Sequence, residues 1–153
     1  GMGETSADII EIALKLKELD APSIPVNYFM PIQGTQLSAP SNLTPDYCIR
    51  VLALFRFTNP NAEIRVAAGR ELHFRSLQVL TLYIANSLFM EGYLNTTGTD
   101  TQTTLQMIKD AGFSISSNQN LDDILKKSTT SGKSNDITIK NIETLRPSLT
   151  KQV

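Results

Sequence analysis

The chain has 153 residues, of which 41% are hydrophobic and 19% are charged, a balance typical of a single globular domain. The formal net charge of −1 provides no basic field for nucleic acid or anionic lipid, so we expect neither a nucleic acid nor a membrane as a partner. The one cysteine excludes an internal disulfide framework and an all-cysteine metal cage. We find no signal peptide and no apolar run of about 20 residues, and this pattern predicts a cytoplasmic protein.

The first elements in chain order are a helix and a strand. Segment 6–19 has apolar residues at helical spacing, with Thr5 as the predicted N-cap and Asp8 as an acidic residue in the first turn. Segment 23–30, "SIPVNYFM", is short and apolar and follows a turn-like "APS". This pattern predicts a buried strand.

A second helix and strand follow. Segment 44–60 is a predicted helix that begins with Thr44 as N-cap and Pro45 at the first helical position, and it ends at Asn59-Pro60. Segment 62–69, "AEIRVAAG", is a predicted strand that is followed by glycine.

The third pair and a closing helix complete the pattern. We expect a helix over 74–85, a strand around Ser87–Met90, and a helix over 101–113 that Gly112 terminates. Helices and strands that alternate at this spacing favour right-handed βαβ units, and hence an α/β fold with about three parallel strands.

Three parallel strands alone would leave the faces and edges of the sheet incompletely covered. Parallel sheets are normally covered on both faces, and an open edge invites association. A closed eight-stranded barrel needs about 200 residues or more. We therefore expect the chain to be part of a larger structure, and we expect it to form a homo-oligomer.

The composition changes after Phe113. Segment 121–127 predicts a short helix, and 128–134 is a small-polar linker. We expect a domain over 1–113 and a tail over 114–153, with the last 20 to 30 residues, roughly, poorly ordered.

Two polar side chains interrupt the predicted strands. Arg65 lies between Ile64 and Val66, although arginine is almost never fully buried without a partner. It is either a strand-end arginine paired with a carboxylate or a group that the interior of the fold needs. Asn27 is likewise either a structural residue at a strand end or part of a site.

Six blocks of the sequence, in one order, carry a family resemblance. They are "GMGET" (1–5), "SIPVNYFMPIQGT" (23–35), "LTPDYCIRVLALFRFTNPNAEIRVAAGRE" (43–71), "RSLQ" (75–78), "ANSLFMEGYLNTTG" (85–98) and "MIKDAGF" (107–113). Together they resemble the C-terminal portion of the biotin synthases, which are radical S-adenosylmethionine (SAM) enzymes. "EIRVAAGRE" followed by "RSLQ" is the most specific part. The resemblance implies part of a (β/α)8 TIM-type barrel, with strands six to eight at 23–30, 64–68 and 87–90.

The resemblance also implies an activity for the intact enzyme. The family inserts sulfur into dethiobiotin, with a [4Fe–4S] cluster that cleaves SAM and a [2Fe–2S] cluster that supplies the sulfur. The family's CxxxCxxC loop is absent from this sequence, and Cys48 matches none of the cysteines that bind the second cluster. We expect Cys48 to be a buried structural thiol, and the chain alone to bind no cofactor and to be inactive.

Five positions take roles from the family by resemblance. Arg65 matches an unusual arginine ligand of the [2Fe–2S] cluster, and in this chain alone it is expected to seek solvent or a carboxylate. Asn27 matches an asparagine that contacts dethiobiotin and SAM, and Met30 a position whose backbone approaches the SAM adenine. Gly3 and Glu4 belong to the end of a glycine-rich motif that supports SAM.

The residues after the second predicted strand leave alternatives open. Gly69, Arg70 and Glu71 are expected to support the cavity at the carboxyl end of a barrel strand, but Arg70 and Glu71 are also compatible with a surface ion pair. His73, the one histidine, is expected to be solvated. "NPNAE" at 59–63 is expected to be only a turn.

Two other classes of function remain beside the enzyme fragment. One is a stand-alone, non-catalytic half-barrel that self-assembles or completes a partner chain. The other is an independent enzyme that uses Arg65, Arg70 and Glu71, for which the sequence offers no nucleophile–base pair.

Overall fold

The structure is a computed structural model, and it describes residues 1–32, 34–37, 42–90, 92–93, 96–118, 120–128 and 138–139. The helices are α1 (Ser6–Glu18), α2 (Pro45–Thr58), α3 (Arg70–Phe74), the 3-10 helix η1 (Arg75–Tyr83), α4 (Thr101–Asp110) and α5 (Leu121–Ser128). The strands are β1 (Ser23–Val26), β2 (Glu63–Val66), β3 (Ser87–Leu88), β4 (Gly92–Tyr93), β5 (Thr96–Thr97) and β6 (Thr138–Ile139).

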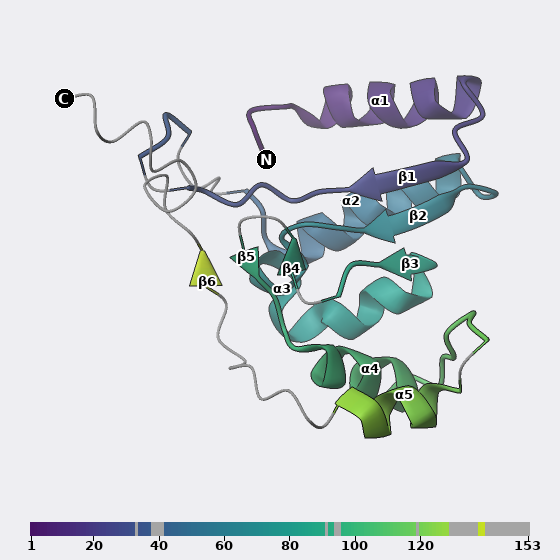
Figure 1. The fold of residues 1–153 in the computed structure, drawn as a ribbon. Helices are drawn as coiled ribbons and strands as arrows, with labels where there is room; N and C mark the ends of the chain where they lie inside the picture. Colours follow the sequence, from purple (N-terminus) through teal and green to yellow (C-terminus); the bar gives the residue numbers. More distant parts are fainter. Residues whose placement is uncertain are drawn as a thin grey trace, which may run out of the picture.

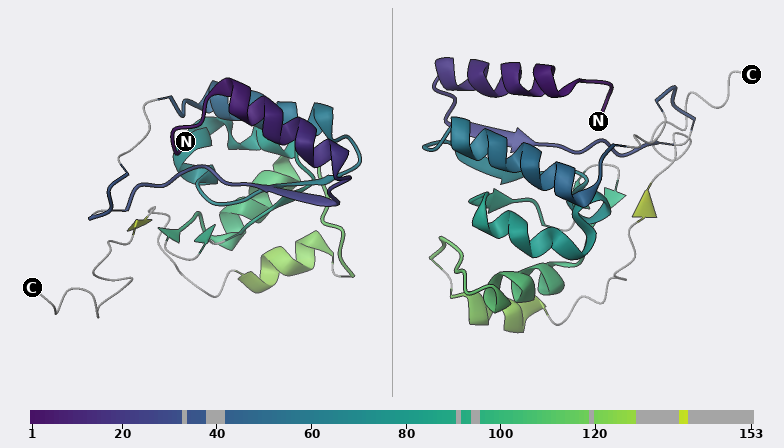
Figure 2. Two further views of the ribbon diagram at one scale, coloured as in Figure 1. Left: turned by 90° about the horizontal axis from the view of Figure 1, so that it is seen from above. Right: turned by 180° about the vertical axis from the view of Figure 1, so that it is seen from behind.

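The main sheet confirms the predicted α/β fold. Its strands are parallel and lie in the order β1-β2-β3, with helices between them in the chain. Helix α2 lies behind the strands in Figure 1 and in front of them when the molecule is seen from behind in Figure 2. An open three-stranded sheet of this kind is consistent with part of a TIM barrel.

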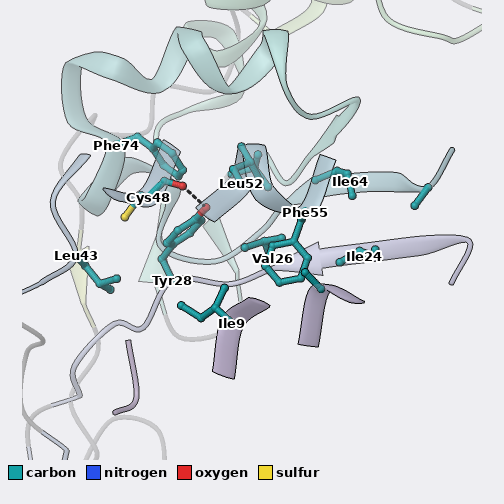
Figure 3. Close-up of a cluster of buried hydrophobic side chains, with 13 residues drawn as sticks. Ile9, Ile24, Val26, Tyr28, Leu43, Cys48, Leu52, Phe55, Ile64 and Phe74 are labelled. Carbon is teal, nitrogen blue, oxygen red and sulfur yellow. Dashed lines mark hydrogen bonds between the residues drawn. The ribbon is translucent and has the colours of Figure 1, made fainter. Parts of the chain in front are cut away.

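The hydrophobic core lies between this sheet and helices α1 and α2 (Figure 3). Alternate residues of β1 and β2 are buried, and they meet buried side chains of the two helices. The core residues of these four elements are Ile9, Ala13, Ile24, Val26, Cys48, Leu52, Phe55, Ile64 and Val66. Because strand side chains alternate between faces, the same strands turn their other residues away from this core.

The predicted helix starts are confirmed for α1 and α2. Thr5 and Asp8 form a capping box, in which each side chain bonds the backbone N–H of the other. Thr44 is the N-cap of α2 and Pro45 its first residue, but the Thr44 hydroxyl donates to Asp46 Oδ1 (2.6 Å) and makes no capping bond.

The prediction of a helix over 74–85 is wrong about where the helix begins and about its type. Gly69 adopts a left-handed conformation (φ +83°) and caps α3, so the helix begins at Arg70. Arg75 has φ 51° and ψ −123°, which ends α3 and begins the 3-10 turns of η1.

The predicted strands exist but are shorter. β1 ends at Val26, and the side-chain oxygen of the next residue, Asn27, accepts a hydrogen bond from the Ala68 N–H. β3 pairs with β2 only at Arg65↔Ser87 and Val66↔Leu88.

In the C-terminal part, the predicted helix over 101–113 is confirmed as α4, which Asp100 caps through the Thr103 N–H (2.9 Å). The small antiparallel sheet of β4, β5 and β6 was not predicted. The predicted short helix is confirmed as α5. The rest of the tail that was expected to be poorly ordered, at 129–137 and 140–153, lies outside the described residues. No helix among the described residues has both the length and the apolar character needed to span a membrane.

Candidate functional site

One face of the sheet carries side chains that are not in the core, and most of them are polar. We call this the open face and define it by Ser23, Pro25, Glu63, Arg65 and Ser87. Ser23 and Pro25 are exposed, and the other three are half-buried. The register aligns Pro25, Arg65 and Ser87 across the three strands. Arg65 therefore lies at the centre of this face.

Arg65 is paired with a carboxylate, as expected for the chain alone. Its Nη2 lies 2.5 Å from Glu63 Oε1, its Nε donates to Ser87 Oγ (2.9 Å), and its guanidinium carbon lies 5.7 Å from the centre of the Phe89 ring. The hydrogen bond from Arg65 is the main cause that lowers the pKa of Glu63, with Ser87 and Ser23 also contributing. Within the described part of the chain, Arg65 Nη1 takes part in no hydrogen bond or ion pair.

Asn27 and Met30 lie just beyond the carboxyl end of β1. Asn27 is exposed, and its Oδ1 accepts a hydrogen bond from the Ala68 N–H (3.2 Å). The next residue, Tyr28, donates its N–H to the Ala68 carbonyl (2.8 Å), so the segments after β1 and β2 stay side by side. Ligands of parallel α/β sheets bind at the carboxyl ends of the strands.

Gly69 follows β2 at a point of close backbone approach. A Cβ atom at this position would clash with the Tyr28 carbonyl oxygen and would lie 3.1 Å from His73 Cδ2. With φ +83° as well, the position requires glycine for two separate reasons.

His73 is buried, so the expectation of a solvated histidine is wrong. It lies on α3 rather than in a loop, and its Nε2 donates to the Phe29 carbonyl at 2.7 Å. No spacing signal in the sequence marks this contact, because its partner is a backbone atom 44 residues away.

Arg70 and Glu71 form a buried ion pair, and the surface-pair alternative is wrong. Their side chains are 2% and 10% exposed, with Arg70 Nη2 2.7 Å from Glu71 Oε1. Arg70 also donates to Gln78 Oε1 (2.8 Å) and Thr104 Oγ1 (3.3 Å), which ties α3 to η1 and α4. Burial lowers the pKa of Arg70, and the charge of Glu71 opposes that shift.

Glu4 and Asn27 line the same cavity. This cavity has a volume of about 240 Å³ and lies between α1, α2 and the edge strand β1. Burial alone would raise the pKa of Glu4, but hydrogen bonds from the Gly1 amino group and the backbone lower it. Gly3 has φ +115° and open space where a Cβ would lie. Arg65 and Arg70 do not line this cavity.

The described residues do not supply a ligand set for an iron–sulfur cluster. Cys48 is a fully buried thiol on α2, in the core on the opposite side of the sheet from Arg65, and burial raises its pKa to about 11. Among the described residues, no three His, Cys, Asp or Glu side chains gather into a possible metal site.

Two polar residues outside the predicted site organise the opposite end of the sheet. Arg56 of α2 donates to the carbonyls of Ile84 (2.8 Å) and Ala62 (2.9 Å), near the amino ends of β3 and β2. Asn59 donates from Nδ2 to the Ala13 carbonyl (3.1 Å), which joins α2 to α1. "NPNAE" is thus more than a turn, although its role is structural.

The comparisons with known proteins agree with this architecture. Residues 25–114 match the family model of the Biotin and Thiamin Synthesis associated domain. The chain belongs to this family. As a member of it, the chain is 53% identical to the biotin synthase of Acaryochloris marina over 121 residues, which cover 79% of this chain and 35% of that protein.

Other biotin synthases give the same result. The protein of Magnetococcus marinus is 53% identical over 115 residues, which cover 75% of this chain and 36% of the relative. The protein of Geobacillus thermodenitrificans is 52% identical over 115 residues, with 75% and 35% covered. This family member therefore spans about a third of the length of the curated relatives that it matches, and it corresponds to the C-terminal portion of a biotin synthase.

Proposed function

We propose that this chain is the C-terminal portion of a biotin synthase whose intact form inserts sulfur into dethiobiotin by SAM-dependent radical chemistry. The observation that carries the proposal is the identity of about 53% to biotin synthases over three quarters of this chain. In the intact form, the remaining donors for a [4Fe–4S] and a [2Fe–2S] cluster would come from the other two thirds of the protein. The chain alone would be inactive.

Arg65 would be the residue of this chain that binds the [2Fe–2S] cluster. A guanidinium must lose a proton or share its electron density to bind iron, although arginine is protonated in nearly all settings. The Glu63 carboxylate favours the charged form and so opposes that change. Arg65 would therefore have to loosen its ion pair with Glu63 before its guanidinium could give an electron pair to iron.

The other candidate residues would bind or support the small molecules. Asn27 is exposed at the carboxyl end of β1, where its amide N–H groups are available to dethiobiotin or SAM. Glu4 lines the same cavity as Asn27. Gly3 and Met30 do not line it, and they would approach SAM through their backbone. Three residues that follow β2 would hold these binding residues in position: Gly69, Arg70 and Glu71.

A stand-alone half-barrel is the second candidate. Helix α1 exposes three large apolar side chains, Ile10, Ile12 and Leu14, and β1 and β3 are edge strands of the described sheet. Apolar surface and unpaired edges favour association, so this function predicts a homo-oligomer that covers them. Light scattering of the chain in solution distinguishes the two candidates, because a monodisperse monomer would contradict the half-barrel.

The first test of the proposed enzyme is the DNA upstream of the codon for Met2. An in-frame CxxxCxxC and further barrel strands are expected there. In the full-length protein, replacement of Arg65 by Met or of Asn27 by Ala should abolish or strongly reduce biotin formation. Arg50→Met, at an exposed position of α2, is the matched control and should leave the rate unchanged. Full activity after both site changes would refute the residue assignments.

A further inference from the structure

His73 is the one side chain in the described structure that bonds the carbonyl of Phe29. It is 7% exposed, and its Nε2 lies 2.7 Å from that oxygen. A carbonyl only accepts, so the proton must be on Nε2. A buried polar side chain with one strong bond of this kind fixes the position of its partner.

Several contacts hold the segment after β1, and they act on different residues of it. Tyr28 is fixed by its N–H to the Ala68 carbonyl (2.8 Å), by its hydroxyl to the Cys48 carbonyl (3.1 Å) and by the edge of the Phe74 ring (4.9 Å between ring centres). All of these contacts are made by Tyr28 itself. The His73 bond acts one residue further on, directly before Met30.

Helix α3 explains how His73 reaches this backbone. Gly69 lets the chain after β2 approach the Tyr28 carbonyl, and α3 begins at once, so His73 comes to lie one turn later over Phe29. The Tyr28 and His73 rings pack 6.2 Å apart. The Phe29 carbonyl, directly before Met30, is thus bonded from the carboxyl end of the neighbouring strand.

We propose that His73 is a positioning residue that holds the Phe29–Met30 backbone in place and thereby sets the affinity of this part of the site for the adenosyl group of SAM. The inference rests on the proposed function, which brings SAM to this edge of the sheet. His73 does not line the cavity that Glu4 and Asn27 share, so we expect it to act through Phe29. Loss of the bond should therefore weaken SAM binding without altering the binding of dethiobiotin.

The isolated chain gives the first test, because His73 is its single histidine. A long-range proton–nitrogen NMR spectrum of this chain contains the signals of one imidazole. This imidazole should carry a proton on Nε2 that exchanges slowly with water. A neutral ring with its proton on Nδ1, or a rapidly exchanging Nε2 proton, would overturn the inference without any variant.

The second test measures binding in the full-length protein. His73→Leu removes the donor, whereas His73→Gln keeps an N–H donor at the end of the side chain. Loss of one hydrogen bond predicts an increase of about threefold to tenfold in the Kd of SAM for His73→Leu. We expect no change in the Kd of dethiobiotin, and recovery of most of the SAM affinity in His73→Gln.

Asn59→Ala is the control. It removes the buried hydrogen bond to the Ala13 carbonyl, which joins α2 to α1, and leaves the Phe29 carbonyl bonded to His73. It should lower the melting temperature and leave the Kd of SAM unchanged. A general loss of structure would instead weaken both ligands in all variants.

The outcomes separate the inference from the function on which it rests. If the unaltered full-length protein binds neither SAM nor dethiobiotin, the proposed function fails. If it binds both and His73→Leu has the same two Kd values, only the role of His73 is refuted. Equal weakening of both ligands in His73→Leu would also refute it, since a structural role alone would then suffice.

Discussion

Glu63 and Arg65 lie two residues apart on β2 and form an ion pair on the open face of the sheet, with 2.5 Å between Glu63 Oε1 and Arg65 Nη2. Residues at this spacing point to the same side of a strand, so the pair needs no contribution from another element. Ser87 of β3 accepts a further hydrogen bond from Arg65. The charge in the middle of the sheet is therefore balanced within the chain, at side chains that are each 35% exposed.

Glu63→Gln should lower the stability of the chain in a pH-dependent way. The pKa of Glu63 is lowered from its ordinary value of 4.5, mainly by the hydrogen bond from Arg65. A lowered pKa in the folded state means that the ion pair adds stability above pH 4.5 and that this stability is lost as the pH falls through the lowered pKa. Urea unfolding should show a less stable variant at neutral pH and no difference in strong acid. A difference that grows in acid would contradict the pairing.

Gly69→Ala should be severely destabilising. A non-glycine residue in the left-handed region costs about 1–3 kcal/mol, and the added Cβ would also clash with the Tyr28 carbonyl oxygen. Gly112→Ala is the control, because Gly112 has a similar φ of +78° but open space around its Cβ position. Its cost should stay near 1 kcal/mol, the approximate penalty of the conformation alone. Equal losses in denaturant unfolding would exclude a close approach at Gly69.

Arg70→Met should cost about 3–5 kcal/mol, because it leaves the Glu71 carboxylate buried without its partner. The double variant Arg70→Met/Glu71→Gln should recover a large part of this loss, since no buried charge remains. Arg50→Met removes an exposed pair with Asp46 (3.7 Å) and should change stability by less than about 0.5 kcal/mol. Thermal unfolding of the three variants tests this predicted order of stability loss. A double variant that is less stable than Arg70→Met would contradict the argument.

Cys48 should be unreactive in the folded chain. The thiol is fully buried, and burial raises its pKa to about 11, so almost no reactive thiolate is present at neutral pH. A thiol reagent such as dithiobis(nitrobenzoic acid) should give no signal with the native chain and one equivalent of product in guanidinium chloride, since the chain has one cysteine. Rapid labelling of the native chain would show that α2 does not pack as described.

The elements with strong local signals could be predicted from the sequence. The capping residues of α1, the proline at the start of α2 and the apolar strand around Ile64 act within a few residues, and all three are found in the structure. The order of these elements was enough to predict a parallel α/β sheet. The strand ends and the 3-10 geometry of η1 could not be predicted, because they depend on Asn27, Gly69 and Arg75 meeting distant backbone atoms or adopting a left-handed conformation.

The candidate site divides in the same way. The sequence alone identifies Arg65 and Asn27 as polar residues in apolar strands, and the blocks around them assign the family, because residue type and spacing are properties of the chain itself. Only the tertiary structure decides that Arg70 and Glu71 are buried, that Glu4 and Asn27 share a cavity, and that His73 bonds Phe29. Burial and hydrogen bonding are relations between segments far apart in the chain, and they exist only once the strands have been brought together.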